Sequence, residues 1–142
     1  MRRGFTFIEL AVVLVILALV TAITFPRLQG LLDWIAVNNA AQDVTTAVAV
    51  TRNAAIMQGS RRRLVIAPDS LRIDRWAGDS WARLERWRGP DGHGVTLEVS
   101  NAVVVFDPTG LPWGVSNTKV VLRRGVRSET ITLSRVGRVK RW

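Results

Sequence analysis

The stretch FTFIELAVVLVILALVTAITF, residues 5–25, decides how this chain is organised. Apart from Glu9 it carries no charged side chain, and most of its residues are Val, Leu, Ile, Ala or Phe. At the 1.5 Å rise of an α-helix, about 20 residues are needed to cross a hydrocarbon core of about 30 Å. The sequence therefore predicts a membrane-spanning helix over residues 5–26.

Glu9 is the one charged residue inside this predicted helix. A carboxylate at bilayer depth costs about 2.5 to 3.5 kcal/mol, which indicates that it has a partner and a function. If the chain is cut after Gly4, the new amine of Phe5 lies four residues before Glu9, on the same helix face. That amine, from the same chain or from a neighbour, would neutralise Glu9. Between two chains, this pairing would set the axial offset of their helices.

A cleavable secretory signal is the alternative interpretation of the same segment. Arg2 and Arg3 precede the apolar run, and residues 20–22 would suit a small-residue cleavage site. The charge of Glu9 and the length of the apolar run both disfavour this alternative. Because no comparable basic cluster follows the span directly, we expect a cytoplasmic amino terminus. The remainder of the chain would then face the periplasm or the outside.

The helix is expected to continue past Pro26. Proline removes one helical hydrogen bond and predicts a kink. Beyond it, apolar residues at three-four spacing predict an amphipathic helix over residues 27–59, which ends near Gln58 with Gly59 as the stop. The apolar positions include Leu28, Leu31, Leu32, Ile35, Ala40, Val44, Ala47, Val48 and Ala54, with Asp33, Asn38 and Asp43 expected on the other side. The apolar stripe should pack on a globular domain.

After Gly59 the apolar period changes from helical to alternating. Short runs separated by Gly, Pro, Asn and Asp predict about seven strands. They cover residues 63–67, 71–76, 81–87, 95–99, 102–106, 118–124 and 129–134, followed by a last strand or tail from Val136. This spacing favours an antiparallel sheet over crossover units. We therefore predict an α+β fold, in which the long amino-terminal helix packs on a small antiparallel β-sheet domain over residues 60–142.

The residue types needed for catalysis or metal binding are scarce. The chain has no cysteine and one histidine, His93, which lies in the turn-like sequence 91–94. Asp69, Asp74 and Asp79 alternate with arginines and do not form a calcium loop. No glycine-rich phosphate loop follows a strand. We therefore expect no enzyme activity and neither a metal nor another cofactor.

The chain has six tryptophans and no tyrosine. One hypothesis is that exposed indole rings stack on the bases of a single-stranded nucleic acid. Trp81, Arg83, Glu85 and Trp87 alternate along one predicted strand and are expected to share a face. A Trp–Arg ladder of this kind is more often a sheet surface or a subunit contact. One of these two roles, a sheet surface or a subunit contact, is preferred over base stacking.

The net charge of +9 is concentrated at the carboxyl end. Residues 119–142 hold eight basic side chains against one acid, Glu129. Guanidinium groups suit phosphate geometry, so the tail residues Arg135, Arg138, Lys140 and Arg141 form a candidate DNA-binding site. A solvated basic face, or one that meets acidic neighbours or anionic lipid, is the preferred interpretation.

The sequence Gly4-Phe5-Thr6-Phe7-Ile8-Glu9-Leu10, followed by the apolar run and Pro26, closely resembles the amino terminus of type IV pilins and type II secretion pseudopilins. This resemblance implies that residues 1–4 are a leader which a prepilin peptidase removes after Gly4. It also implies that Phe5 becomes N-methylphenylalanine, that Glu9 serves fibre assembly, and that Pro26 marks the helix kink.

The order of a helix followed by a β domain is similar to that of the minor pseudopilin H and FimT group (GspH/FimT). The turn at residues 106–110 and the closing Gly137-Arg138-Val139-Lys140 resemble features of that group, although Lys140 replaces a second arginine of the FimT-like pattern. The resemblance implies a minor pseudopilin of a type II secretion fibre. In FimT-like proteins the basic tail is associated with DNA uptake, which is the alternative function, carried here by Arg138, Lys140 and Arg141.

The same resemblance implies a location and a set of partners. The chain would be a single-pass protein of the bacterial inner membrane that is later extracted into a periplasmic pseudopilus. Its partners would be other pseudopilins or pilins, the prepilin peptidase and the inner-membrane assembly platform. DNA remains a candidate partner of the tail.

Overall fold

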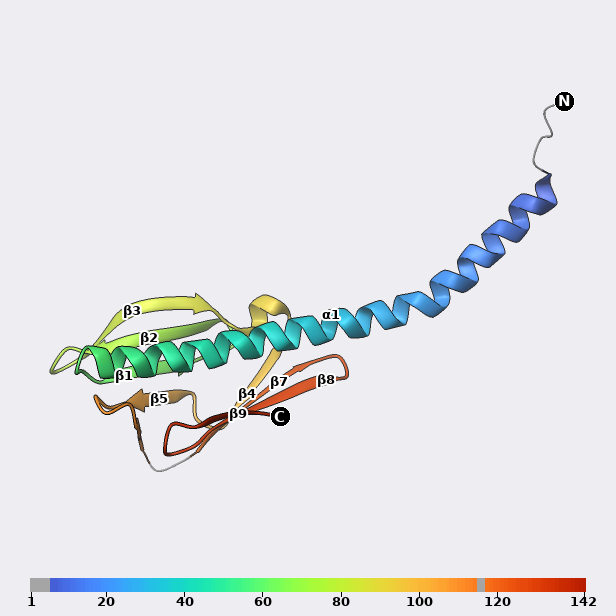
Figure 1. The fold of residues 1–142 in the computed structure, drawn as a ribbon. Helices are drawn as coiled ribbons and strands as arrows, with labels where there is room; N and C mark the ends of the chain where they lie inside the picture. Colours follow the sequence, from blue (N-terminus) through green and yellow to red (C-terminus); the bar gives the residue numbers. More distant parts are fainter. Residues whose placement is uncertain (1–5, 115–116) are drawn as a thin grey trace. The chain divides into compact units, whose positions relative to one another are not determined.

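The computed structural model describes residues 6–114 and 117–142. The chain divides into two compact units, residues 1–32 and 33–142. One helix, α1 (Phe7–Met57), begins in the first unit and ends in the second (Figure 1). The predicted long helix is therefore confirmed.

The described part of the first unit is helical from Phe7 onward, and none of its side chains is buried. Pro26 lies inside α1, so helix continuation through this residue is confirmed, while the kink stays a prediction. Two hydroxyls are satisfied within the helix: Thr21 Oγ1 donates to the Leu17 carbonyl at 2.7 Å, and Thr24 Oγ1 to the Val20 carbonyl at 2.8 Å. Such back-bonding leaves few unpaired polar groups on an apolar helix surface.

The carboxyl end of α1 has the hydrogen bonds of a Schellman motif. The Ser60 amide donates to the Ala55 carbonyl and the Gly59 amide to the Ile56 carbonyl, both at 3.3 Å. Gly59 adopts φ 57°, a conformation that glycine enters without steric cost. The predicted stop at Gly59 is confirmed.

The second unit contains two antiparallel sheets. The first has the order β3-β2-β1-β5-β6 and comprises β1 (Arg62–Ile66), β2 (Ser70–Trp76), β3 (Trp81–Arg88), β5 (Val103–Phe106) and β6 (Pro112–Trp113). The second has the order β4-β7-β8-β9 and comprises β4 (Thr96–Val99), β7 (Thr118–Arg124), β8 (Arg127–Leu133) and β9 (Val139–Arg141). A short 3₁₀ helix, η1 (Pro90–His93), precedes β4. The α+β class is confirmed, but the expected single sheet is divided in two.

The core lies between α1 and the inner faces of both sheets. The helix contributes small or β-branched side chains, mainly Ala36, Val37, Ala40, Ala41, Val44, Ala47, Val48 and Ala55. The sheets contribute larger ones, mainly Leu64, Ile66, Leu71, Ile73, Val104, Phe106, Val120, Leu122, Ile131 and Leu133. Small helical residues allow close approach of the sheets, which fills the core to high density. Two residues of the apolar stripe predicted for α1 are not buried in this unit: Ile35 is 39% exposed and Ala54 is only partly buried.

A register shift in the β2–β3 pair corrects one prediction. Ile73 lies opposite Glu85 and Asp74 opposite Arg83, so Leu84 is an extra residue in β3. Such a bulge disturbs the alternation of side chains along a strand. Trp87 consequently packs against the core, whereas Trp81 lies beneath the Arg63 guanidinium on the outer face. The prediction that both tryptophans share a face is therefore wrong.

Candidate functional site

Glu9 lies in the first turn of α1, where its backbone amide donates to Thr6 Oγ1 at 3.3 Å. Thr6 and Glu9 have the spacing of a capping box, and an acidic side chain is favourable at a helix amino terminus. The Glu9 side chain is exposed, and none of the ion pairs formed within residues 6–114 and 117–142 includes it. Its carboxylate is therefore open to a partner outside this part of the chain. The predicted cleavage residues Gly4 and Phe5 lie outside the described residues.

The first unit offers a continuous apolar surface around Glu9. Leu10, Val13, Leu14 and Leu17 are each about half exposed, and the apolar side chains continue beyond Phe25. The helix is long and apolar enough to cross a membrane. Soluble monomers rarely expose apolar patches larger than a few hundred Å², so this surface needs lipid or other subunits to cover it.

The β7–β8 hairpin is fastened to α1 by Arg124. Its Nε donates to Asp33 Oδ1 at 2.9 Å, and its Nη1 donates to the His93 carbonyl. The His93 ring Nε2 lies 2.8 Å from Asp43 Oδ2. Gly125, at φ 54°, packs so closely on Asp33 that a Cβ would come within 2.4 Å of Oδ2. These contacts tie the hairpin, η1 and the helix together.

We expect Asp33→Asn to lower the free energy of unfolding by about 1 kcal/mol, because the Arg124 pair is only partly buried. The measurement is urea unfolding of the full chain in non-ionic detergent, followed by tryptophan fluorescence. The control is Glu98→Gln, which breaks the more exposed Arg123–Glu98 pair and should cost less than about 0.5 kcal/mol. Equal costs for the two variants would contradict a special role of Asp33.

The predicted DNA-binding residues differ in their surroundings. Arg141 is engaged within the fold: its Nε donates to Glu129 Oε1 and its Nη2 to Asn38 Oδ1 at 2.8 Å. The hydrogen bond to Glu129 raises the pKa of Arg141. These bonds hold β9 against β8 and α1. Arg141 thus has a structural role, which its sequence context did not indicate.

The other three basic side chains of the tail are exposed. Arg135 and Arg138 flank the turn before β9, and the Lys140 ammonium lies 4.4 Å from the centre of the Trp142 ring. Within the described residues, none of the three takes part in an ion pair. They remain available to an anionic partner.

Sequence reasoning missed Asp33, Asn38 and Asp43 as contact residues. We expected them on the side of α1 away from the domain, but they bond to Arg124, Arg141 and His93 respectively. Successive residues at a spacing of five are about 140° apart around an α-helix, so the spacing itself did not place these three side chains on one face. The sequence alone did not identify their basic partners.

The structure shows how the turn noted in the sequence at residues 106–110 is stabilised. Asp107 Oδ1 accepts hydrogen bonds from the Thr109 amide at 2.9 Å, the Thr109 hydroxyl at 2.6 Å and the Leu111 amide at 3.1 Å. The bond from the Thr109 hydroxyl lowers the pKa of Asp107. Gly110, at φ 81°, lies against Ile56 so closely that a Cβ would come within 2.6 Å of Cδ1. The turn therefore closes over the carboxyl end of α1.

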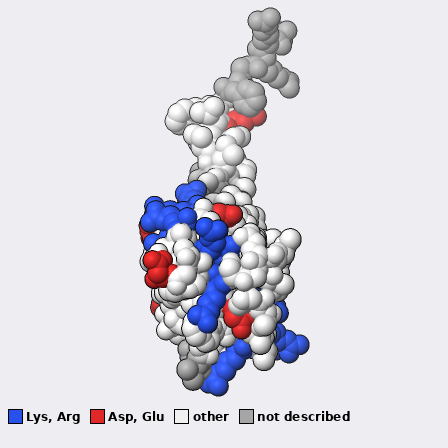
Figure 2. Space-filling model, turned by 90° about the vertical axis from the view of Figure 1, so that its left-hand side faces the viewer, with Lys and Arg blue, Asp and Glu red and all other residues white. Residues whose placement is uncertain are grey.

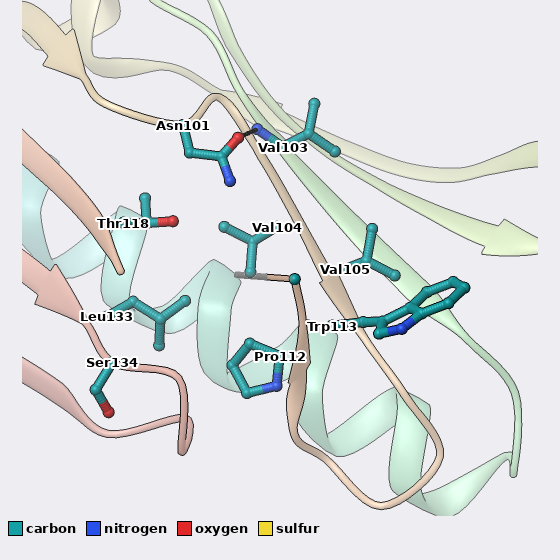
Figure 3. A pocket seen from close by; sticks show the side chains of 10 residues that line it. Asn101, Val103, Val104, Val105, Pro112, Trp113, Thr118, Leu133 and Ser134 are labelled. Carbon is teal, nitrogen blue, oxygen red and sulfur yellow. Dashed lines mark hydrogen bonds between the residues drawn. The ribbon is translucent and has the colours of Figure 1, made fainter. Parts of the chain in front are cut away.

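The hollows in the second unit are small or open. The one in Figure 3, lined mainly by β5, β6 and the ends of β7 and β8, measures about 30 Å³, room for about two water molecules. A shallow hollow of about 260 Å³ lies along β4 and β7, lined by Glu98, Val99, Ser100, Lys119 and Val121. Among the described residues, no cluster of three or more His, Asp or Glu could hold a metal ion. The arrangement supports binding between surfaces better than chemistry in a pocket.

Comparison with known proteins found a match to the amino-terminal sequence and a match to the fold. The prokaryotic N-terminal methylation motif matches residues 1–25. Two crystal structures of the type IV minor pilin FimU of Pseudomonas aeruginosa PAO1 share the fold, each at 16% sequence identity. The TM-scores are 0.62 and 0.63, over 74% and 73% of this chain and 91% and 86% of the FimU chains. No curated protein sequence matches the chain.

Three observations describe the kind of protein to which this chain is similar. The methylation motif at residues 1–25 overlaps a helix that is long and apolar enough to span a membrane. The fold is similar to that of a minor pilin. The chain therefore combines the N-terminal methylation motif with a fold similar to that of a type IV minor pilin.

Proposed function

We propose that this protein is a minor pseudopilin, a subunit of the short periplasmic fibre of a type II secretion system. The observation that carries the proposal is Glu9, an exposed carboxylate on an apolar helix inside a prepilin methylation motif. The order of a helix followed by a β domain resembles that of the GspH/FimT group, which includes type II pseudopilins. Within this assembly the subunit contributes contacts and catalyses no reaction.

The proposed cycle begins in the inner membrane. The chain inserts with its amino terminus in the cytoplasm and its second unit in the periplasm, and a prepilin peptidase cuts after Gly4. Methylation of the new amine at Phe5 leaves a nitrogen that can still be protonated. This cation pairs with Glu9, and the charge of Glu9 is neutralised only when neighbouring helices have the correct axial offset.

Extraction from the bilayer replaces lipid by other subunits around residues 7–32. The apolar side chains then pack between helices, where van der Waals contacts and pairing of the few polar groups determine the arrangement. The membrane assembly platform and neighbouring pseudopilins are the partners of this step. An ATPase on the cytoplasmic side would supply the energy.

The mass of the mature protein tests the processing step. We expect a chain that starts at Phe5 and carries one additional methyl group, measured by intact-mass spectrometry of protein from the native membrane. Substitution of Gly4 by a bulky residue should leave the leader attached. A mature chain that starts near Ile23 would instead identify a secretory signal and contradict the proposal.

Deletion of the gene tests the assignment to a secretion system. Loss of export of folded proteins, with normal surface pili and normal DNA uptake, would support a type II pseudopilus. Loss of pili or of DNA uptake with normal export would contradict it. Restoration by the wild-type gene and not by a Glu9→Leu variant would connect the phenotype to fibre assembly.

DNA capture is a second candidate function, favoured by the exposed side chains of Arg135, Arg138 and Lys140. Binding through several phosphate contacts would weaken steeply with salt. Replacing these three residues by alanine should then abolish the salt-dependent part of binding to duplex DNA. Arg141 should be retained in this experiment, because its substitution would also release β9. Salt-dependent binding that survives the triple substitution would exclude the tail as the site.

A further inference from the structure

The outer face of the five-stranded sheet lies on the side away from α1 and carries a row of residues that face one another across all five strands. Arg83, Asp74, Arg63, Val105 and Trp113 stand in direct register. Residues directly opposite in antiparallel strands share a face. The outer face combines cationic and aromatic side chains, and we call it the Arg–Trp face, defined by Arg61, Arg63, Asp74, Trp81, Arg83 and Trp113.

Two arginines of this face, Arg61 and Arg63, are stacked on indole rings. The Arg61 guanidinium carbon lies 3.7 Å from the centre of the Trp113 ring, and that of Arg63 lies 4.7 Å from Trp81. Trp76 packs on Trp81 with centroids 5.1 Å apart and an interplanar angle of 63°. Stacking fixes a guanidinium in place, so less side-chain entropy is lost when a partner binds.

The positive charge of this face exceeds what its own carboxylate can balance. Asp74 is 2% exposed, and its two oxygens lie 2.6 Å from Arg63 Nε and 3.1 Å from Arg72 Nε. Within the described residues, neither Arg61 nor Arg83 has an ion-pair partner. On the side of the molecule that Figure 2 views, Lys and Arg cover more of the surface than Asp and Glu, as expected from the net charge of +9. The face therefore has excess positive charge and free N–H donors.

The chemistry of the face selects an acidic polypeptide. A flat guanidinium can donate two parallel hydrogen bonds from its edge to a carboxylate while its face rests on an indole. Val103, which is 40% exposed, and Val105 adjoin Trp113 and suit the apolar side chains of a peptide. The indole faces of Trp81 and Trp113 are partly covered by arginine, so they are poorly placed for stacking with nucleic-acid bases. A second copy of this chain, with a net charge of +9, would be repelled.

We propose that the Arg–Trp face binds an acidic segment of a different polypeptide. The further identification of that polypeptide as a neighbouring fibre subunit rests on the proposed function. Carboxylates would bind at the edges of Arg61 and Arg83, and the segment would lie across the sheet from β3 toward β6. This contact would select a partner by charge, in addition to the non-selective packing of apolar helices.

A peptide-binding experiment tests the face without requiring fibre assembly. The full chain in non-ionic detergent is titrated into a fluorescent peptide that alternates glutamate with alanine, and anisotropy is recorded at low salt. The comparison probes are the same peptide with glutamine in place of glutamate and an oligothymidylate of equal charge. We expect binding of the glutamate peptide, no binding of the glutamine peptide, and weaker binding of the oligothymidylate.

The decisive variants change equal amounts of charge at two locations. Arg61→Gln with Arg83→Gln should weaken binding of the glutamate peptide by about tenfold or more. The control, Lys119→Gln with Arg127→Gln, removes two exposed basic side chains from the other sheet and should weaken binding by about twofold or less.

Equal losses in the two double variants would show that only net charge matters and would overturn the proposal. Tighter binding of the oligothymidylate than of the peptide would also overturn it, in favour of a nucleic-acid surface. Because the assay contains no fibre, it can succeed or fail independently of Glu9 and of fibre assembly.

Discussion

Glu9→Leu should leave the protein inserted in the membrane and reduce its incorporation into fibres by about tenfold or more. Removing the carboxylate makes insertion more favourable by about 2.5 to 3.5 kcal/mol, so the membrane pool should not fall. Incorporation should fall because the amine at Phe5 then has no carboxylate to pair with in the fibre. The measurement is the ratio of sheared or extracted fibre protein to membrane protein by immunoblot.

Two further substitutions separate the charge of Glu9 from its position in the helix cap. Glu9→Gln keeps a side chain suited to a capping box but removes the charge, so it should fail like Glu9→Leu. Thr6→Ala removes the hydroxyl that accepts from the Glu9 amide and keeps the charge, so it should assemble normally. Normal incorporation of Glu9→Gln, or failure of Thr6→Ala alone, would show that helix capping and not charge pairing governs assembly.

Phe106→Ala should lower the free energy of unfolding of the second unit by about 3 to 5 kcal/mol. Phe106 is fully buried, lies opposite Arg62 in β1, and belongs to the core shared by α1 and both sheets. Truncation loses the transfer free energy of the ring and leaves a cavity that the small side chains of α1 cannot fill. The measurement is urea unfolding of the full chain in detergent, with tryptophan fluorescence as the signal.

The matched control for this prediction lies on the same strand. Val103→Ala removes apolar atoms from a side chain that is 40% exposed on the outer face, so it should cost less than about 1 kcal/mol. A cost for Phe106→Ala no greater than that for Val103→Ala would contradict the position assigned to the core. Both variants retain all six tryptophans, so the signal is unchanged.

Local patterns were sufficient to predict the helix and most strands. The predicted strand over residues 118–124 coincides with β7, and the predicted helix end near Gln58 lies one residue beyond Met57. Both segments have a regular apolar period and a glycine at the end, so local sequence determines them. β6 has only two residues, one of them proline, and no alternation to detect. Its existence depends on pairing with β5 and not on its own sequence.

The division into two sheets could not be predicted from local patterns. β4 and β5 are consecutive strands, yet β4 pairs with β7 and β5 with β1. Which strands pair depends on contacts between residues far apart in sequence, and the apolar periodicity of a single strand carries no information about these contacts. The same limitation applies to Arg141, which was grouped with the exposed tail because its partners lie on β8 and α1.

The bond between Arg141 and Asn38 joins residues 103 positions apart and has a consequence for biosynthesis. A ribosome must polymerise at least 141 residues before this bond can form, and more residues remain in the exit tunnel at that point. The anchoring helix, in contrast, emerges early and can enter the translocon while synthesis continues. Membrane targeting should therefore precede folding of the second unit, so that newly made chains pass through an interval in which the alanine-rich side of α1 requires protection by chaperones.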